Sequence, residues 1–370
     1  MEKIKLGDIA SFSKGKQINV SNLISNGKYD FLNGGINPSG KWNDFNVNEN
    51  SIAISEGGNS CGYVNFMKNK FWCGAHCYYL YDVKLNIKYL YYNLKANEKK
   101  IQKLRSGACM PNIKKKDLYD FEIWYLSDKR EQEKIVKQLD KVQEIIDLRK
   151  KQIEELDELI KSRFVELFGD LENTKYKVYK LSELTNLITD GEHKKPNYIE
   201  EGVPFISVAN ITTGKLKFDD CKFVSEEDAY KFNKRCNPEK DDILYTKVGA
   251  TYGRSVIVNT NSKFTLYVSV CLIKPKKELI NPIFLNYTMR QSYVKLQADK
   301  CIKGIGVPDL HLIEIKNFNI IVPPIEKQNE FAKFVKQIDK QNLVIEKSLK
   351  ATEELQESLM NKYFGGYKNG

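Results

Sequence analysis

Two long segments of the chain carry apolar residues at helical spacing. From about residue 129 to 168, and again from about 325 to 364, apolar positions recur every three or four residues without an interrupting glycine or proline. The stripes comprise Ile135, Leu139, Val142, Ile146, Ile153, Leu156, Ile160, Phe164 and Leu167, then Phe331, Val335, Ile338, Ile345, Leu349, Leu355 and Leu359. Such a segment predicts a helix of roughly 60 Å at ~1.5 Å per residue. We expect the two helices to pack on each other as an antiparallel coiled coil.

The two helical segments belong to an internal repeat. Residues 5–9 (KLGDI) recur in type at 180–184 (KLSEL), and residues 51–62 recur without a gap at 242–253. Residues 132–169 align without a gap onto 328–365. Matched pairs include Ser55 with Thr246, Gly58 with Gly249, Gly62 with Gly253, and Pro111 with Pro308. Each half is therefore a variable domain followed by a long helix.

The repeat predicts an α+β chain with a pseudo-twofold organisation. Two α/β domains are expected at residues 1–126 and 170–324. Spacer helices are expected at 127–169 and, with the tail, at 325–370. The first helix is preceded by Ser127-Asp128 where the second has Pro323-Pro324, so its start is uncertain by a few residues.

The chain is basic, and its charge is unevenly distributed. Its 370 residues carry a formal net charge of +11 with 11% aromatic residues, a composition typical of a folded protein with a polyanionic partner. The excess of lysine and arginine lies in the two variable domains, while the helical segments are nearly neutral. No run of about 18 apolar residues occurs, so we expect a cytoplasmic protein without a membrane partner.

The order of these motifs resembles the specificity subunits of type I restriction-modification systems. The resemblance covers essentially the whole chain and rests on the paired KLGDI and KLSEL openings, the segments NSIAISEGGNSCG and DDILYTKVGATYG, and the exits MPNIKKKDLYDFEI and VPDLHLIEIKNFNI. The helical segments EQEKIVKQLDKV and EKQNEFAKFVKQIDK follow these exits. Each motif is loose alone, but their order, found twice, is specific.

The resemblance implies a non-catalytic subunit that recognises double-stranded DNA. Each variable domain would read one half of a split, asymmetric site, and the helices would set the spacing and dock modification subunits. The expected partners are DNA adenine methyltransferase subunits, two copies, and ATP-dependent restriction and translocase subunits. No cofactor is expected in this chain.

Two rival functions are compatible with parts of the sequence. A self-contained methyltransferase or nuclease would need motifs that are incomplete here. Asn281-Pro282-Ile283-Phe284 lacks the second proline of an adenine-holding motif, and we interpret it as a helix start. Pro308-Asp309 with Glu314-Ile315-Lys316 imitates a metal nuclease, but only four residues separate Asp309 from Glu314. The other rival is a duplicated scaffold that binds proteins and not DNA.

The eight cysteines include one cluster with metal-binding chemistry, formed by Cys73, His76 and Cys77. A fourth ligand at a recognisable spacing is missing, and the surrounding run FWCGAHCYYL alternates like a strand. We therefore expect a strand core there and no metal. Reduced thiols are the expected state of the cysteines.

Polar loops of both domains supply candidate DNA contacts. The loop 189–195 resembles a DG-x-H-K loop of the family's recognition domains. Candidates in the second domain are His193, Lys194, Lys195, Lys247, Thr251, Tyr252, Arg254 and Lys303. Candidates in the first domain are Asn33, Asn37, Lys41, Ser55, Glu56, Asn59 and Arg105. Such side chains bond base edges or phosphates, or simply face solvent, and the sequence leaves these alternatives open.

Overall fold

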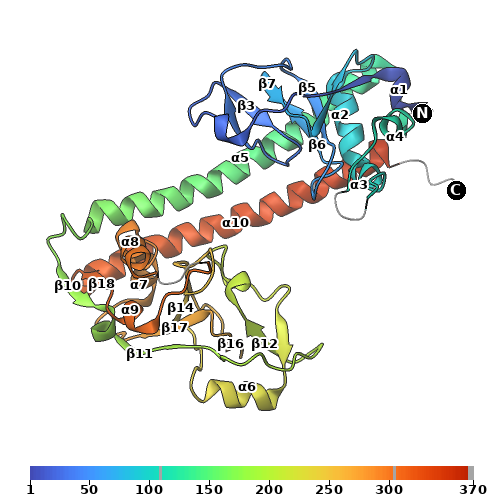
Figure 1. Cartoon of the computed structure of the whole chain (residues 1–370). Helices are drawn as coiled ribbons and strands as arrows, with labels where there is room; N and C mark the ends of the chain where they lie inside the picture. Colours follow the sequence, from blue (N-terminus) through green and yellow to red (C-terminus); the bar gives the residue numbers. More distant parts are fainter. Residues whose placement is uncertain (108–110, 303–305, 366–370) are drawn as a thin grey trace. The chain divides into compact units, whose positions relative to one another are not determined.

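The computed structural model describes residues 1–107, 111–302 and 306–365. It divides into two compact units. One consists of Met1–Gln152 with Ile345–Gly370, and the other of Ile153–Val344. Each long helix, α5 (Lys129–Phe168) and α10 (Ile325–Phe364), labelled in Figure 1, therefore contributes one part to each unit.

The long helices confirm the sequence prediction, and their ends have local causes. Asp128 caps the start of α5, because its Oδ1 accepts a hydrogen bond from the backbone N–H of Arg130 at 2.8 Å. Gly169 ends α5 with a φ of 70°, a conformation that glycine adopts without strain. Its N–H donates to the carbonyl of Val165 at 2.8 Å. The uncertain start of the first helix is thus resolved at Lys129.

In the first unit, three small sheets surround the core. Their strand orders are β2-β8-β5-β6, β4-β3-β7 and β1-β9. The strands are β1 (Glu2–Lys5), β2 (Ser11–Lys14), β3 (Tyr29–Leu32), β4 (Gly40–Trp42), β5 (Ser51–Ser55), β6 (Val64–Met67), β7 (Phe71–Cys73), β8 (Cys77–Tyr81) and β9 (Glu122–Tyr125). Only β3 and β7 pair in parallel among these strands of the described chain.

The second unit repeats this topology strand for strand. Its orders are β11-β17-β14-β15, β13-β12-β16 and β10-β18, with β12 and β16 parallel. The strands are β10 (Lys177–Lys180), β11 (Thr185–Asp190), β12 (Val203–Ile206), β13 (Lys222–Val224), β14 (Ile243–Thr246), β15 (Ser255–Ile257), β16 (Thr265–Leu266), β17 (Val270–Pro275) and β18 (Asn319–Val322). The duplication read from the sequence is therefore a duplication of topology.

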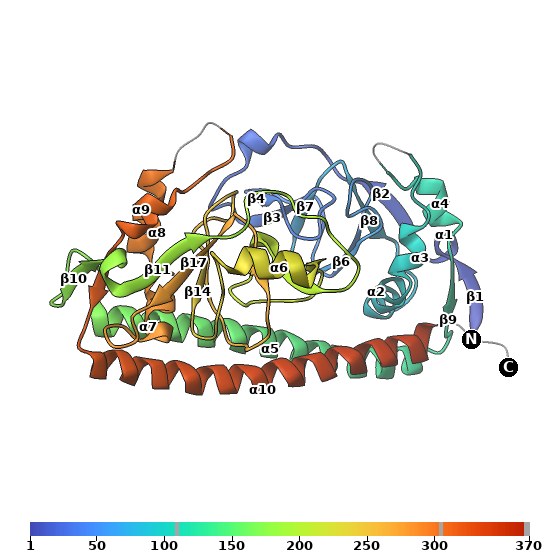
Figure 2. The ribbon, with the colours of Figure 1, turned by 90° about the horizontal axis from the view of Figure 1, so that it is seen from below.

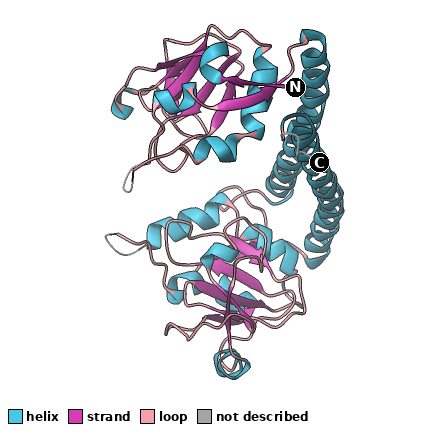
Figure 3. Cartoon of the chain, turned by 90° about the vertical axis from the view of Figure 1, so that its right-hand side faces the viewer, coloured by secondary structure: helices cyan, strands magenta, loops and turns pink. Residues whose placement is uncertain are grey.

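Short helices pack at the margins of the strands, which are magenta in Figure 3. The first unit has α1 (Leu6–Ile9), α2 (Ile87–Ala96), α3 (Glu98–Gln102), α4 (Lys115–Tyr119) and the 3-10 turn η1 (Val20–Asn22). The second has α6 (Glu226–Asn233), α7 (Pro282–Thr288), α8 (Ser292–Cys301), α9 (Leu312–Lys316) and the 3-10 turns η2 (Leu181–Leu184) and η3 (Val208–Asn210). α2 packs on β5 and β6, and α7 packs on β15.

Within each unit, the halves of α5 and α10 run antiparallel (Figure 2). In the first unit, Gln356 donates to Gln143 at 2.8 Å, and Lys150 pairs with Glu353 at 3.0 Å. In the second unit, the rings of Phe164 and Phe331 lie 5.5 Å apart, edge to face. These contacts place the two helices beside each other within each unit, while coiled-coil packing along the whole of the apolar stripes stays a prediction. Leu355 is 51% exposed and does not belong to the buried stripe.

Each domain is fastened to the long helices by the same aromatic contact. In the second unit, the rings of Phe168 and Phe284 lie 5.0 Å apart. In the first unit, the equivalent rings of Phe364 and Tyr89 lie 5.3 Å apart. Aromatic pairs of this kind contribute about 1 kcal/mol beyond their buried area. The end of α5 therefore packs on the second domain, which precedes α10 in the sequence. The end of α10 packs on the first domain, which precedes α5.

The run FWCGAHCYYL differs from the single strand that its alternation predicts. Cys73 ends β7 and Cys77 begins β8, and the two strands belong to different sheets. Gly74 lies at the turn between them, where its N–H donates to the carbonyl of Leu32 at 2.8 Å. Both cysteines are buried free thiols. The strand-core prediction holds for both residues, but a turn divides the run.

Candidate nucleic-acid interface

One candidate loop of each domain begins at an equivalent corner of the four-stranded sheet. After β5, the N–H of Gly58 donates to the carbonyl of Pro111 at 3.0 Å. After β14, the N–H of Gly249 donates to the carbonyl of Pro308 at 2.9 Å. Both glycines have positive φ, 75° and 91°, which explains the residue type at this turn. The strand that precedes each turn is fully buried, so the corner is held rigidly.

At the first-domain corner, a buried carboxylate holds an exposed cation. Glu56 is 8% exposed, and its Oε1 forms an ion pair with Nζ of Lys14, whose side chain is half exposed. The hydroxyl of Tyr78 also donates to Oε1 of Glu56, at 3.4 Å, and to the carbonyl of Ile113 at 3.2 Å. Burial, followed by the charge of Glu56, raises the pKa of Tyr78 to about 12, so this hydroxyl stays a donor at neutral pH.

The first-domain loops 33–37 and 55–60 are tied together by serine hydroxyls. Ser55 Oγ donates to the carbonyl of Gly35 at 3.3 Å, and Ser60 Oγ donates to the carbonyl of Gly34 at 2.5 Å. Asn33 Oδ1 accepts from the N–H of His76 at 3.2 Å. The structure thus brings these two predicted loops together. The side chains of Ser55 and Asn33, however, form hydrogen bonds within the domain.

At the second-domain corner, the charges are reversed. Asp190 lies at the end of β11, where the first domain has Lys14, and Lys247 follows β14, where the first domain has Glu56. Lys247 Nζ lies 3.5 Å from Oδ2 of Asp190 and 3.6 Å from Oδ1 of Asp309. Lys247 and Asp190 are 7% and 4% exposed. The predicted DNA contact at Lys247 is therefore a buried, paired cation.

The turn after Lys247 exposes other candidate side chains. Thr246 Oγ1 accepts from the N–H of Arg254 at 2.8 Å and donates to the carbonyl of Thr251 at 2.7 Å, which closes the turn. The Tyr252 hydroxyl donates to Asp299 of α8 at 2.5 Å, and Lys295 pairs with the same carboxylate. Thr251 and Arg254 are exposed and Tyr252 is half-buried.

The predicted residues differ in how well they could reach a ligand. Exposed candidates are Asn37, Lys41, Asn59, Arg105, His193, Lys194, Lys195, Thr251 and Arg254. Ser55, Glu56 and Lys247 are buried, and Asn33 and Tyr252 are intermediate. Lys41 lies on β4 and approaches Asp30 of β3 at 3.8 Å, away from the corner. Lys303 lies outside the described residues.

Three residues of the corners are not among the side chains that the sequence predicts as DNA contacts, namely Lys14, Arg235 and Asp190, although Asp190 stands in the predicted loop 189–195. Arg235 Nη1 donates to Oδ1 of Asp190 at 3.2 Å, and its Nη2 donates to the carbonyl of Gly191 at 2.5 Å. A sequence signal existed for Arg235. It lies in the stretch between β13 and β14, which contains α6, whereas the matching stretch between β4 and β5 contains no helix in the described chain.

The motifs that imitate enzyme sites have structural roles. Asn281 caps α7, because its Oδ1 accepts from the N–H of Ile283 at 2.9 Å and of Phe284 at 3.3 Å, which confirms the helix-start interpretation. Asn86 caps α2 in the same manner. Asp309 pairs with Lys247. Within residues 1–107, 111–302 and 306–365, no three His, Cys, Asp or Glu side chains group as a metal ion requires.

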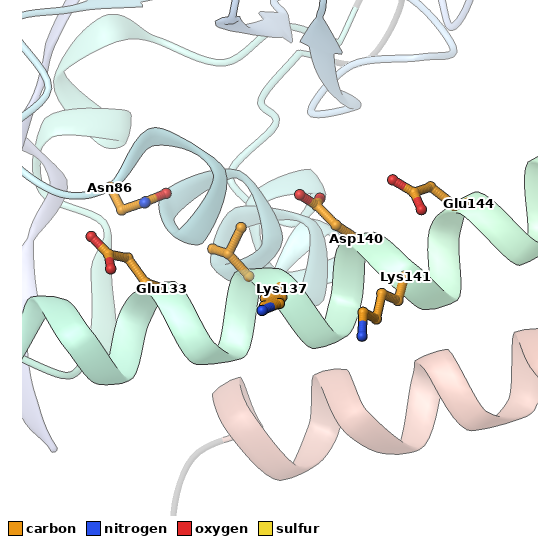
Figure 4. Close-up of a pocket in the computed structure, with 7 residues that line it drawn as sticks. Asn86, Glu133, Lys137, Asp140, Lys141 and Glu144 are labelled. Carbon is orange, nitrogen blue, oxygen red and sulfur yellow. The ribbon is translucent and has the colours of Figure 1, made fainter.

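A shallow groove lies on α5 in the first unit (Figure 4). It has a volume of about 350 Å³ and is lined by Asn86, Glu133, Val136, Lys137, Asp140, Lys141 and Glu144. Asp140 is held by Lys88 at 2.5 Å and by the Tyr92 hydroxyl at 2.7 Å. Burial, followed by the bond to Asp140, raises the pKa of Tyr92 well above its usual range. Alternating acids and lysines give this surface mixed charge.

The sequence of the duplicated chain matches a known family. The model of the type I restriction modification DNA specificity domain matches residues 1–158 and 173–355. The chain belongs to this family and is a DNA-recognition subunit of the type I restriction-modification class, without a catalytic role of its own.

Curated relatives carry the corresponding names. A putative type I specificity subunit of Mycoplasma genitalium is 26% identical over 383 residues, covering 98% of this chain and 93% of that protein. The MjaVIII specificity subunit of Methanocaldococcus jannaschii is 25% identical over 399 residues, covering 99% and 92%. A putative specificity subunit of Mycoplasma pneumoniae is 38% identical over 161 residues, which span 43% of this chain and 41% of that protein.

Solved structures share the fold. The S subunit of a type I restriction-modification system from M. genitalium superposes with a TM-score of 0.62 at 24% identity, covering 99% of this chain and 96% of that one.

No helix in the described part of the chain is long and apolar enough to cross a membrane.

Proposed function

We propose that the two domains read the two halves of one bipartite, asymmetric double-stranded DNA site. A single observation carries this proposal: the same sheet corner occurs twice but presents opposite chemistry. The first domain pairs an exposed Lys14 with the buried Glu56, and the second buries Lys247 against Asp190. Two copies of one scaffold with different reading surfaces favour two different half-sequences, so the site is asymmetric.

We further propose that residues 1–126 and 170–324 act as the recognition domains and that 127–169 and 325–370 act as the spacer. The proposed DNA contacts are polar side chains of the candidate loops, most of them exposed. In the first domain these are Asn37, Asn59 and Arg105, supported by Asn33, Ser55 and Glu56, with Lys41 on β4. In the second domain they are His193, Lys194, Lys195, Thr251, Tyr252 and Arg254, with Lys247 behind them. Arg and Lys donate to guanine, and Asn pairs with adenine.

The proposed partners are two DNA adenine methyltransferase subunits, joined for restriction by ATP-dependent endonuclease and translocase subunits. The groove on α5 supports docking of a protein partner, because its lining alternates Glu133, Lys137, Asp140, Lys141 and Glu144. Mixed charge of this kind gives specificity of orientation and speeds encounter more than it adds affinity.

A genome-wide map of methylated adenines, with and without this gene, tests the proposal. The expected result is one two-part motif, with two unequal half-sequences and an unspecified gap, that disappears when the gene is removed. A continuous palindromic motif would contradict the two-domain split. A salt titration of DNA binding separates the rival protein scaffold, because a DNA reader loses affinity steeply as salt rises.

A further inference from the structure

Arg235 follows α6, in a stretch that distinguishes the second domain from the first. The interval between β13 and β14 holds α6, while the interval between β4 and β5 is shorter and holds no helix in the described chain. Cys236, the next residue, is 2% exposed and anchors the backbone, whereas Arg235 itself is exposed. The second domain therefore adds a cation at its corner from a segment that the first domain lacks.

The carboxylate of Asp190 organises the surface at this corner. It is 4% exposed, and a carboxylate this deeply buried needs partners to offset its lost hydration. Lys247 supplies one from the interior side, at 3.5 Å from Oδ2. Arg235 and His193 approach Oδ1 at 3.2 Å and 3.1 Å, and their side chains are 51% and 61% exposed. One buried acid thus holds two side chains that face solvent.

The guanidinium of Arg235 is fixed at two points. Nη1 donates to Asp190, and Nη2 donates to the carbonyl of Gly191, a residue that is itself buried. These bonds use two of the five N–H donors of the guanidinium and leave three for a ligand. A planar group whose orientation is set before binding loses little entropy when it forms a bidentate contact.

Arg235 differs from the neighbouring lysines, which have the properties of phosphate contacts. Lys194 and Lys195 are exposed on the adjoining loop, and neither side chain forms an ion pair with another described residue, which suits contacts to phosphates. In the first domain, the cation held by the buried acid is Lys14, an ammonium that acts as a point charge. Only the second domain offers a fork in a fixed orientation at this corner of the described structure.

We infer that Arg235 is a base-reading side chain of the second domain, with guanine in the major groove as its target and Asp190 as its positioning residue. The inference rests on the proposed function and assigns one position of the second half-sequence. Bidentate donation to O6 and N7 of guanine is the contact that a fixed guanidinium fits best.

Selection from a random-sequence double-stranded DNA library tests this assignment. The full chain and its variants are used, and the enriched sequences are compared position by position. For Arg235→Ala we expect discrimination for guanine at one position of one half-sequence to fall by about 5- to 150-fold, with the rest of the motif unchanged. Arg235→Lys keeps the charge but lacks the fork, so it should lose the same preference. Asp190→Asn should weaken that preference less than Arg235→Ala does.

The control is Lys231→Ala, which removes a cation from α6, the helix that precedes Arg235, where Lys231 pairs with Glu227 at 2.7 Å and not with Asp190. It should leave the motif unchanged. The unaltered positions of the second half-sequence show that the variants are folded. A uniform loss of affinity with an unchanged motif, or full rescue by Arg235→Lys, would make Arg235 a phosphate contact and overturn the inference. If the wild-type chain itself selects no two-part motif, the proposed function fails before Arg235 is reached.

Discussion

Lys247 lies buried with its Nζ 3.5 Å from the Oδ2 of Asp190, at the corner where the first domain carries the reverse arrangement of charge. The same scaffold therefore accepts an ion pair of either polarity at this point. A buried pair contributes little net stability, but removing one partner leaves an uncompensated charge and is strongly destabilising. A substitution of Lys247 therefore tests whether its side chain is buried against Asp190.

The substitution Lys247→Met should destabilise the second unit by about 3 kcal/mol, because it leaves Asp190 and Asp309 without their shared cation. Urea unfolding of the full chain, followed by far-UV circular dichroism, measures the effect. All three tryptophans, Trp42, Trp72 and Trp124, lie in the first unit. Their fluorescence transition should therefore stay where it is in the wild type.

Lys194→Met is the matched control, since Lys194 is exposed beside the same corner. It should change stability by less than about 0.5 kcal/mol. An unchanged dichroism midpoint for Lys247→Met, together with weaker DNA binding, would mean that Lys247 faces the ligand and not the interior.

Much of the fold follows from the sequence, because the signals that predict it are local or repeated. Glycine and proline positions bound the second long helix, and Gly169 ends the first. The gapless match of 51–62 with 242–253 predicts two equivalent turns, and Gly58 and Gly249 form them. The exposure of Leu355 was not predictable in this way. Helical spacing shows which residues share a stripe, but it does not show where along the stripe the other helix covers them.

The candidate site is less predictable, because its contacts join residues far apart in the sequence. Asp190 and Arg235 come from different elements, and the motif around Asp190 gives no sign of its contact with Arg235, which lies in no recognisable motif. Glu56 and Lys247 stand in polar loops, but their burial depends on Lys14 and Asp190, which only the folded sheet brings near. Residue type therefore predicts a polar loop, while tertiary packing decides which of its side chains faces a ligand.

Tyr287 makes the second unit sensitive to alkaline pH. Burial raises the pKa of Tyr287 to about 12, against about 10 in an unfolded chain. Because the folded pKa is the higher one, its contribution is fully present below pH 10 and is lost as pH rises from about 10 to 12. We expect Tyr287→Phe to resemble the wild type at pH 8 and to be more stable by about 2 kcal/mol near pH 12.

The measurement is the urea midpoint by circular dichroism at both pH values. The exposed Tyr230 supplies the control, since Tyr230→Phe should not alter the pH dependence. Equal alkaline losses in the wild type and in Tyr287→Phe would show that the hydroxyl of Tyr287 is hydrated in the folded protein.

Replacing residues 1–126 with another recognition domain should change one half of the methylated motif and leave the other half intact. The exchanged domain must keep two contacts to the long helices. The ring of Tyr89 packs on Phe364, and the N–H of Asn86 donates to Gln132 at 3.1 Å. A replacement domain with an asparagine at the position of Asn86 and an aromatic residue at that of Tyr89 meets this condition. A map in which both half-sequences change would mean that the domains share base contacts.

The long helices should act as a ruler between the half-sites, and the antiparallel pairing shows how to lengthen it. Lys150 pairs with Glu353, and Gln143 with Gln356, so an insertion after Lys151 in α5 faces one after Lys347 in α10. Four helical residues added at both points extend each helix by roughly 6 Å at ~1.5 Å per residue. At ~3.4 Å per base pair, the gap between the half-sequences should grow by one or two base pairs. An insertion after Lys151 alone is the control, and it should lower stability because it shifts one helix against the other. If the doubly extended variant methylated a motif with altered half-sequences and an unchanged gap, the helices would not set the spacing.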